Sequence, residues 1–131
     1  MTGFHHEKMD VYRASIEFLT LAARLAEGIP RGNGYVTDQL QRAAMSIALN
    51  IAEGAGEFSR QDKTRFYRIA RRSATECAAI LDAMVALEIA RRDDVQMGKQ
   101  LLDRICAMLT RLAQPDERTG SGSAMSERND L

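Results

Sequence analysis

The chain has 131 residues, which is enough for one domain with a single hydrophobic core. Hydrophobic residues make up 45% and charged residues 27%, and the formal net charge is zero, so no overall field draws the protein to nucleic acid or to an anionic membrane. No apolar run approaches the roughly 18–20 residues that span a bilayer, and we therefore expect a cytoplasmic protein with no membrane segment.

Apolar residues recur at helical spacing in four segments, which we predict as helices at about 7–27, 37–54, 60–88 and 93–113. The loops between them are short, which favours antiparallel neighbours. The sequence therefore predicts an all-α domain over residues 1–114, an antiparallel up-down-up-down four-helix bundle. Residues 115–131 are Gly-rich, Ser-rich and charged, and we predict a disordered tail there.

Residues that favour helix ends mark three of the predicted starts. Thr37 is the predicted N-cap of the second helix and Ser59 that of the third. Asp93 and Gln96 have the spacing of a capping box at the start of the fourth. The inner apolar stripe of the third helix begins at Phe66.

Few residues have the chemistry of a catalytic or metal site. Cys77 and Cys106 lie in apolar helical patterns, which indicates core residues in a reducing compartment. His5, His6 and Glu7 could bind a metal in principle, but we interpret them as part of a frayed terminus. Neither cysteine lies near a histidine in the sequence, Ser46 and Ser73 lie in apolar helical patterns, and no phosphate-binding glycine loop follows a strand. We expect no enzyme activity and no cofactor.

The second predicted helix is unusually apolar. Its strongly polar residues after position 41 fall on one narrow line along the helix: Arg42, Ser46, Asn50 and Glu53. The rest of its circumference is Ala, Met, Ile and Leu, which indicates burial on nearly every side. We therefore predict that a second copy of the chain covers this helix, with Met45 and Leu49 at the interface. The alternative is that exposed alanines are tolerated and the excess is incidental.

The polar line together with Glu76 of the third helix has two interpretations. It could bind a small polar ligand, or it could be a structural network in which Arg42 pairs with Glu76 or with a carboxylate of a neighbouring subunit. We favour the structural interpretation, since polar groups between helices often determine register and oligomeric state.

The third helix begins with a local excess of positive charge, because Asp62 is the one acid among residues 60–72. Arg65, Arg68, Arg71 and Arg72 could contact nucleic acid, whose phosphates bind Lys and Arg. The alternative is a solvated face with helical ion pairs. Zero net charge and the absence of interleaved exposed aromatics favour the alternative.

Residues 39–76, QLQRAAMSIALNIAEGAGEFSRQDKTRFYRIARRSATE, resemble the bacterial family of proteins encoded within intervening sequences of 23S ribosomal RNA genes. The resemblance extends over about residues 4–113. Arg72 and Glu57 differ from the family pattern, which commonly has Gly and Arg there. The matching positions in this sequence are Met9, Val11, Tyr12, Ala14, Gln39, Leu40, Arg42, Ala43, Ala44, Ser46, Ile47, Asn50, Ile51, Ala52, Glu53, Gly54, Gly56, Arg65, Phe66, Ile69, Ala70, Ser73 and Glu76.

This resemblance implies a small four-helix bundle that forms homo-oligomers, typically pentamers, with no established catalytic activity. A distant relative is an accessory partner of a reverse transcriptase in diversity-generating retroelements, so nucleic acid or a nucleic-acid enzyme is a second implied partner. We therefore expect a homo-oligomeric scaffold or interaction protein, with nucleic-acid binding as the alternative.

Overall fold

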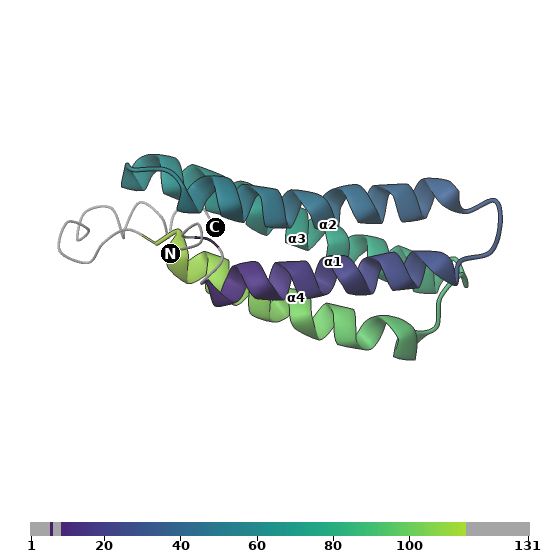
Figure 1. Cartoon of the computed structure of the whole chain (residues 1–131). Helices are drawn as coiled ribbons and strands as arrows, with labels where there is room; N and C mark the ends of the chain where they lie inside the picture. Colours follow the sequence, from purple (N-terminus) through teal and green to yellow (C-terminus); the bar gives the residue numbers. More distant parts are fainter. Residues whose placement is uncertain (1–5, 7–8, 115–131) are drawn as a thin grey trace.

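The computed structural model describes residue 6 and residues 9–114, and this part of the chain forms four helices and no strand. Each helix packs against the next one in the chain, and α1 packs against α4 to close the ring (Figure 1). The prediction of an all-α up-down-up-down bundle is confirmed, while the predicted disordered tail at 115–131 lies outside the described residues. The helices are α1 (Asp10–Glu27), α2 (Gly34–Ala55), α3 (Arg60–Ala86) and α4 (Arg92–Leu112).

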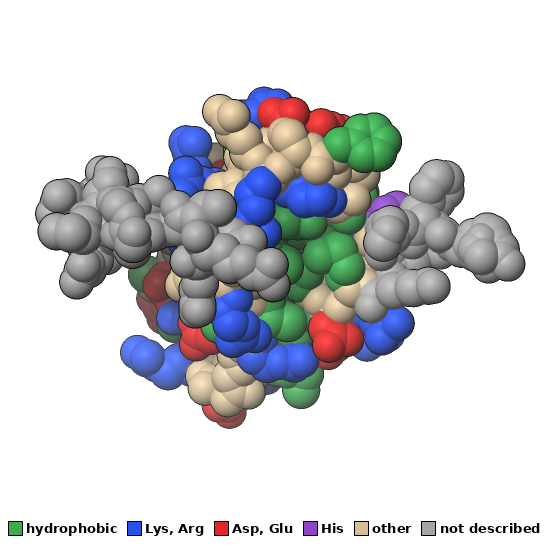
Figure 2. Space-filling view, turned by 90° about the vertical axis from the view of Figure 1, so that its left-hand side faces the viewer, with side chains coloured by type: hydrophobic (Ala, Val, Ile, Leu, Met, Phe, Trp, Pro, Cys, Tyr) green, Lys and Arg blue, Asp and Glu red, His purple; other side chains and the backbone are tan. Residues whose placement is uncertain are grey.

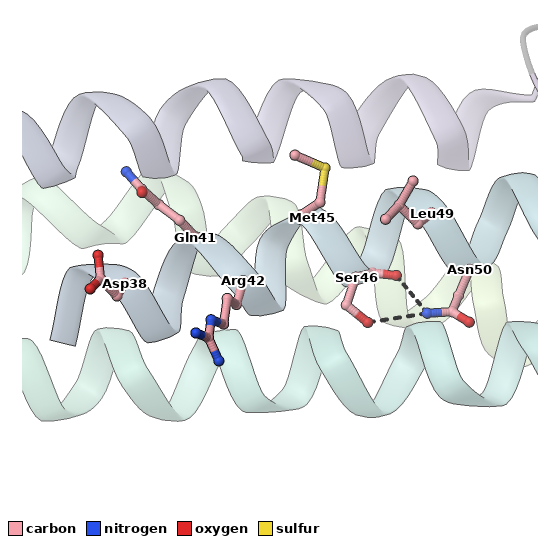
Figure 3. Close-up of a pocket in the computed structure, with 7 residues that line it drawn as sticks. All are labelled: Asp38, Gln41, Arg42, Met45, Ser46, Leu49 and Asn50. Carbon is pink, nitrogen blue, oxygen red and sulfur yellow. Dashed lines mark hydrogen bonds between the residues drawn. The ribbon is translucent and has the colours of Figure 1, made fainter. Parts of the chain in front are cut away.

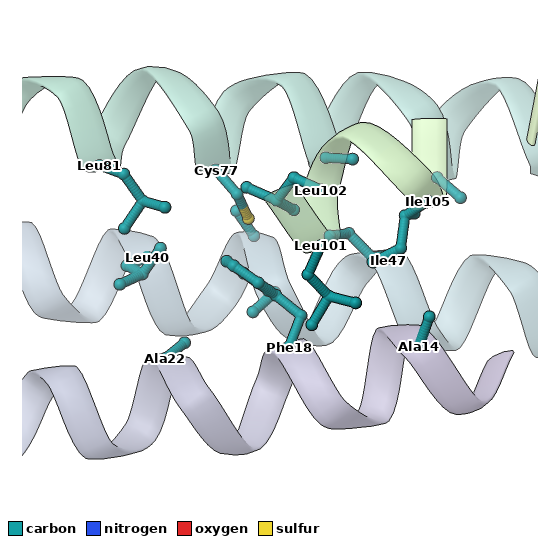
Figure 4. Packing of buried hydrophobic residues seen from close by; sticks show 14 of the residues in the cluster. Ala14, Phe18, Ala22, Leu40, Ile47, Cys77, Leu81, Leu101, Leu102 and Ile105 are labelled. Atoms are coloured by element: carbon teal, nitrogen blue, oxygen red, sulfur yellow. The ribbon is translucent and has the colours of Figure 1, made fainter. Parts of the chain in front are cut away.

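The hydrophobic core runs along the axis of the bundle and receives side chains from every helix (Figure 4). Phe18 of α1, Leu40 of α2 and Leu81 of α3 have no exposed surface, and Leu102 of α4 has 1%. Full burial of such a side chain contributes about 1.5–3 kcal/mol. None of the described helices is both long and apolar enough to cross a membrane.

Helix α2 begins earlier than the sequence predicts. Asn33 is its N-cap, and the carbonyl of Asn33 accepts a hydrogen bond from the Val36 N–H at 3.1 Å. Thr37 lies inside the first turn, where it is 9% exposed and its Oγ1 donates to the Gly34 carbonyl at 3.0 Å. The prediction of Thr37 as N-cap is wrong because the packing of α2 requires this side chain inside the bundle.

The start of α4 also differs, whereas the start of α3 agrees. The N-cap of α4 is Arg91, whose backbone N–H donates to Asp94 Oδ2 at 3.2 Å, so the predicted pairing of Asp93 with Gln96 is wrong. At α3 the prediction is confirmed, because the Ser59 hydroxyl accepts the N–H of the third helical residue at 3.1 Å. Each of these hydrogen bonds gives a partner to one of the backbone N–H groups that have no partner within the helix at its start.

Helices α2 and α3 are in close contact near the loop that joins them. Gly54 is buried, and a Cβ added there would lie 2.7 Å from Tyr67 Cε1 and 3.0 Å from Tyr67 Cδ1. The Tyr67 ring is 4% exposed, whereas Phe66, which the sequence placed at the start of the inner stripe, is half-buried. Because Gly54 has no Cβ, the Tyr67 ring can pack directly against the backbone of α2.

Gly54→Ala should lower the free energy of unfolding by about 1–3 kcal/mol, because the new methyl group overlaps a buried ring. Chemical denaturation followed by circular dichroism measures this loss. Gly56→Ala is the matched control, since a Cβ there would meet its nearest neighbours at an ordinary 3.7 Å. Equal stability of the two variants would contradict this account of the α2–α3 contact.

Candidate functional site

Three polar side chains form a hydrogen-bonded group between α2 and α3. The hydroxyl oxygens of Ser46 and Ser73 lie 2.8 Å apart, and either can donate. Asn50 Nδ2 donates to the Ser46 carbonyl at 2.9 Å and to Ser46 Oγ at 3.1 Å (Figure 3). Ser73 is 8% exposed, so this bond supplies a partner to a hydroxyl that water hardly reaches. The bond fixes which side of α2 faces α3.

The charged members of the predicted network do not join this group. Arg42, Glu53 and Glu76 are all exposed, and no ion pair joins Arg42 to Glu76 within residues 9–114. The sequence analysis did not include Ser73 in the polar network and did not predict its hydrogen bond to Ser46. The available signal was a serine among apolar residues, which indicates a satisfied polar contact.

A groove of about 600 Å³ lies along the outer face of α2 (Figure 3). Asp38 and Arg42 line one end, and Met45 and Leu49 supply its apolar surface. Met45 is 45% exposed and Leu49 is 57% exposed, so both predicted interface residues lie on the outside of the bundle. In Figure 3 Met45 points toward α1 and Arg42 toward α3. An open apolar surface beside two opposite charges is suited to binding a helix.

Basic residues at the start of α3 contact the carboxyl ends of two other helices. Lys63 Nζ donates to the carbonyls of Gly54 at 3.4 Å and Ala55 at 3.2 Å, at the end of α2. Arg60 donates to the Gln114 carbonyl, just beyond α4. Cations at these positions satisfy free carbonyls and complement the helix dipole. Part of the local positive charge therefore has a structural role.

The four arginines predicted to contact nucleic acid do not all lie on the same face of α3. Arg71 is half-buried and donates to Thr110 Oγ1 of α4 at 3.3 Å. Arg65 is exposed, lies over the Phe66 ring at 4.7 Å and is 3.8 Å from Asp62. Arg68 and Arg72 are also exposed. The structure thus places Arg65, Arg68 and Arg72 on the outer face of α3 and turns Arg71 toward α4.

Cys77 and Cys106 are free cysteines, and neither thiol is in the ionised form that acts as a nucleophile. Burial, with the negative charge of Glu76 adding to it, raises the pKa of Cys77 to about 12. Burial also raises the pKa of Cys106, and a hydrogen bond with Thr75 offsets this only in part. A thiol reacts through its thiolate form, and both thiols are therefore protonated at neutral pH.

A metal site at the N-terminus falls only partly within the described residues. His6 packs against the edge of the Tyr12 ring, with ring centroids 4.6 Å apart, while His5 and Glu7 lie outside the described residues. Among described residues, no three His, Cys, Asp or Glu side chains cluster at metal-binding distance.

Comparison with known proteins gives a family and a fold. The model of the 23S rRNA-intervening sequence protein family matches residues 7–111. A solved structure, a protein with unknown function from the S23 ribosomal protein family of Bacteroides thetaiotaomicron VPI-5482, is similar with a TM-score of 0.74. That match has 22% identity and covers 80% of this chain and 99% of the other. No curated protein matches this chain.

Ser73→Ala should lower the free energy of unfolding by about 0.5–1.5 kcal/mol, because it removes a hydrogen bond between two helices. Thr20→Ala is the control, since the exposed Thr20 hydroxyl bonds only the Ile16 carbonyl of its own helix. Thermal and urea denaturation of both variants measure the difference. Equal effects would show that the Ser46–Ser73 bond does not stabilise the α2–α3 contact.

Iodoacetamide at pH 8 should label Cys77 only when the chain unfolds. An unfolded cysteine is half ionised near its ordinary pKa of 9.0, whereas folded Cys77 ionises at about 12. Because the pKa of Cys77 is higher in the folded than in the unfolded chain, burial of the neutral thiol contributes to the free energy of unfolding. This contribution is complete below pH 9 and is lost as the pH rises toward 12. Mass spectrometry of digested protein gives the labelling rate. Rapid labelling of Cys77 in the folded state would contradict its assignment to the core.

Proposed function

Because the chain belongs to the 23S rRNA-intervening sequence protein family, we propose that it is a non-enzymatic, homo-oligomeric scaffold whose copies meet through the outer face of α2. The observation that carries this proposal is the exposure of Met45 at 45% and Leu49 at 57% on the outer face of this helix. A single exposed leucine is ordinary on a monomer. Two large apolar side chains one helical turn apart, lining the same groove, are typical of an interface.

The number of copies and the absence of catalysis are parts of the same proposal. Five copies is the number that the family resemblance implies. Both thiols are protonated, which supports a role without nucleophilic catalysis. The groove, which has one carboxylate and one guanidinium at its end, supports the same role. Assembled copies would present several identical surfaces to a partner.

Nucleic-acid binding is the second candidate function. The exposure of Arg65, Arg68 and Arg72 on one face of α3 favours it. Figure 2 views the bundle from the end where α2 joins α3, and Lys and Arg side chains gather there around apolar surface. Lys63 and Arg60, however, bond the ends of α2 and α4, which reduces the charge available to phosphates. We therefore rank this function below assembly.

Leu49→Glu should convert the assembly to monomers at micromolar concentration, because a buried carboxylate without a partner is strongly unfavourable. Size-exclusion chromatography with light scattering gives the mass. Leu87→Glu is the matched control, since Leu87 is 53% exposed and lies beyond the end of α3. A wild-type chain that is already monomeric at these concentrations would overturn the proposed function.

A mobility-shift titration with short RNA and DNA at about 50 mM salt separates the two candidates. The scaffold proposal predicts no shift at micromolar protein. A shift that weakens with salt, and that the double variant Arg65→Glu, Arg72→Glu abolishes, would establish the second candidate instead.

A further inference from the structure

Helices α2 and α4 lie on opposite sides of the bundle. In Figure 1 α2 forms the upper edge and α4 the lower edge, and within the described residues the two helices do not contact each other. Their outer faces are therefore two different surfaces of one copy. A ring with an odd number of copies joins two different surfaces at every contact. The outer face of α4 is accordingly a candidate for the surface that meets the outer face of α2.

Two contacts between α3 and α4 give the relative levels of their residues along the bundle. Arg71 of α3 donates to Thr110 of α4 at 3.3 Å, and Asp82 of α3 forms an ion pair with Lys99 of α4. The step between the two contacts is eleven residues on each helix. The two antiparallel helices therefore keep one register over this length.

The Ser46–Ser73 hydrogen bond extends this register to α2. In the register of the α3–α4 contacts, Ser73 is about level with Met108 of α4, so Ser46 of α2 is about level with Met108 as well. Helices α2 and α4 run in the same direction in an up-down-up-down bundle. Met45, one residue before Ser46, is therefore about level with Ala107.

Ala107 gives the outer face of α4 a shape that complements the large apolar side chains of α2. Ala107 is exposed, and the outward positions one turn before and after it have longer side chains. A short side chain between longer ones lets a neighbouring helix pack closely. Met45 and Leu49, both exposed, are of a size to fill this space. Met97 is ten residues before Ala107, about 15 Å along α4, and lies outside it.

The two outer faces have opposite charges at the same level. Arg42 of α2 and Asp103 of α4 are both exposed, and within residues 9–114 neither forms an ion pair. In the register given above, their levels differ by about one residue, or about 1.5 Å along the axis. A carboxylate and a guanidinium at one level can pair when the two faces of neighbouring copies meet.

Both charges also lie on the same side of the bundle. Figure 3 shows Arg42 pointing toward α3. Asp103 is four residues after Lys99 and seven before Thr110, which is the spacing of one helical face. Because Lys99 and Thr110 contact α3, Asp103 lies on the α3 side of α4. In two copies that stand side by side in one orientation, the α3 sides face the same way, so Arg42 of one copy comes beside Asp103 of the other.

We propose that the outer face of α2 of one copy packs against the outer face of α4 of the next, with Met45 and Leu49 over Ala107 and an Arg42–Asp103 ion pair beside them. This rests on the proposed function, because it takes α2 as the contact between copies and names the surface that covers it. Each copy has one α2 face and one α4 face. Copies therefore add head to tail until the ring closes, all at one level and in one orientation.

Two variants that each damage one face test this contact. Leu49→Glu damages the α2 face and keeps the α4 face, whereas Ala107→Glu does the reverse. Each variant alone should lose the assembled species at micromolar concentration, since every contact between its copies buries a glutamate. An equimolar mixture should form a one-to-one dimer, because one intact face of each kind remains. Native mass spectrometry measures the mixed dimer. Ala79→Glu, at an exposed alanine of α3, is the matched control and should assemble like the wild type.

Charge exchange tests the ion pair itself. Arg42→Asp alone and Asp103→Arg alone should each weaken self-association about tenfold or more, because each places like charges together at every contact. The chain with both substitutions should recover the wild-type mass, since each contact then joins opposite charges again. Sedimentation velocity over a range of concentrations measures the loss and the recovery.

The outcomes separate this contact from the proposed function. A mixed dimer, with recovery in the charge-exchanged chain, supports the α2–α4 contact. A wild-type chain that assembles, with Ala107→Glu assembling equally well and charge exchange giving no recovery, would overturn this contact and leave the proposed function standing. A wild-type monomer would overturn both. Circular dichroism of each variant checks folding, which exposed substitutions should leave intact.

Discussion

The close contact between α2 and α3 is the constraint on which the rest of the bundle depends. Gly54 leaves room for the buried Tyr67 ring, with no space for a Cβ between them. Eight residues earlier in α2, the Ser46–Ser73 hydrogen bond joins the same two helices. Two such contacts on one side of α2 fix its rotation about its own axis. That rotation turns Met45 and Leu49 outward, where the core cannot reach them.

The same contact explains much of the basic character at the start of α3. A close approach near the loop leaves the last carbonyls of α2 beside α3, and Lys63 supplies donors to two of them. Arg60 does the same for the end of α4. In sequence these cations resemble a phosphate-binding cluster, but their positions in the bundle give them partners within the chain. A count of charges therefore overestimates the surface available to nucleic acid.

The sequence predicted the features that depend on periodicity. The four helices and the all-α class follow from apolar spacing, and the outward position of Met45 and Leu49 fits the same pattern. Features that depend on a neighbour across the bundle could not be predicted. Thr37 has the residue type of an N-cap, yet packing places it inside the first turn. The choice of Tyr67 over Phe66 as the buried ring depends on the space at Gly54, which no pattern within α3 contains.

The residues of the candidate site also include some that spacing predicts and some whose contacts only the structure shows. The line of polar residues on α2 is visible from spacing alone, but only the structure separates Ser46 and Asn50, which bond within the chain, from the exposed Arg42. The exposed residues Arg42, Met45 and Leu49 line one groove. A charge that has no ion pair within residues 9–114 and lies beside exposed apolar side chains is a feature of contacts between molecules.

Oxidative footprinting of the methionines tests most directly whether a second copy covers α2. Met45 and Met97 are 45% and 64% exposed in the single bundle, and Met97 lies on α4. As the protein concentration rises from nanomolar to tens of micromolar, the oxidation rate of Met45 should fall severalfold while that of Met97 stays constant. Constant oxidation of both methionines over this range would show that the outer face of α2 remains open to solvent, and would contradict the account.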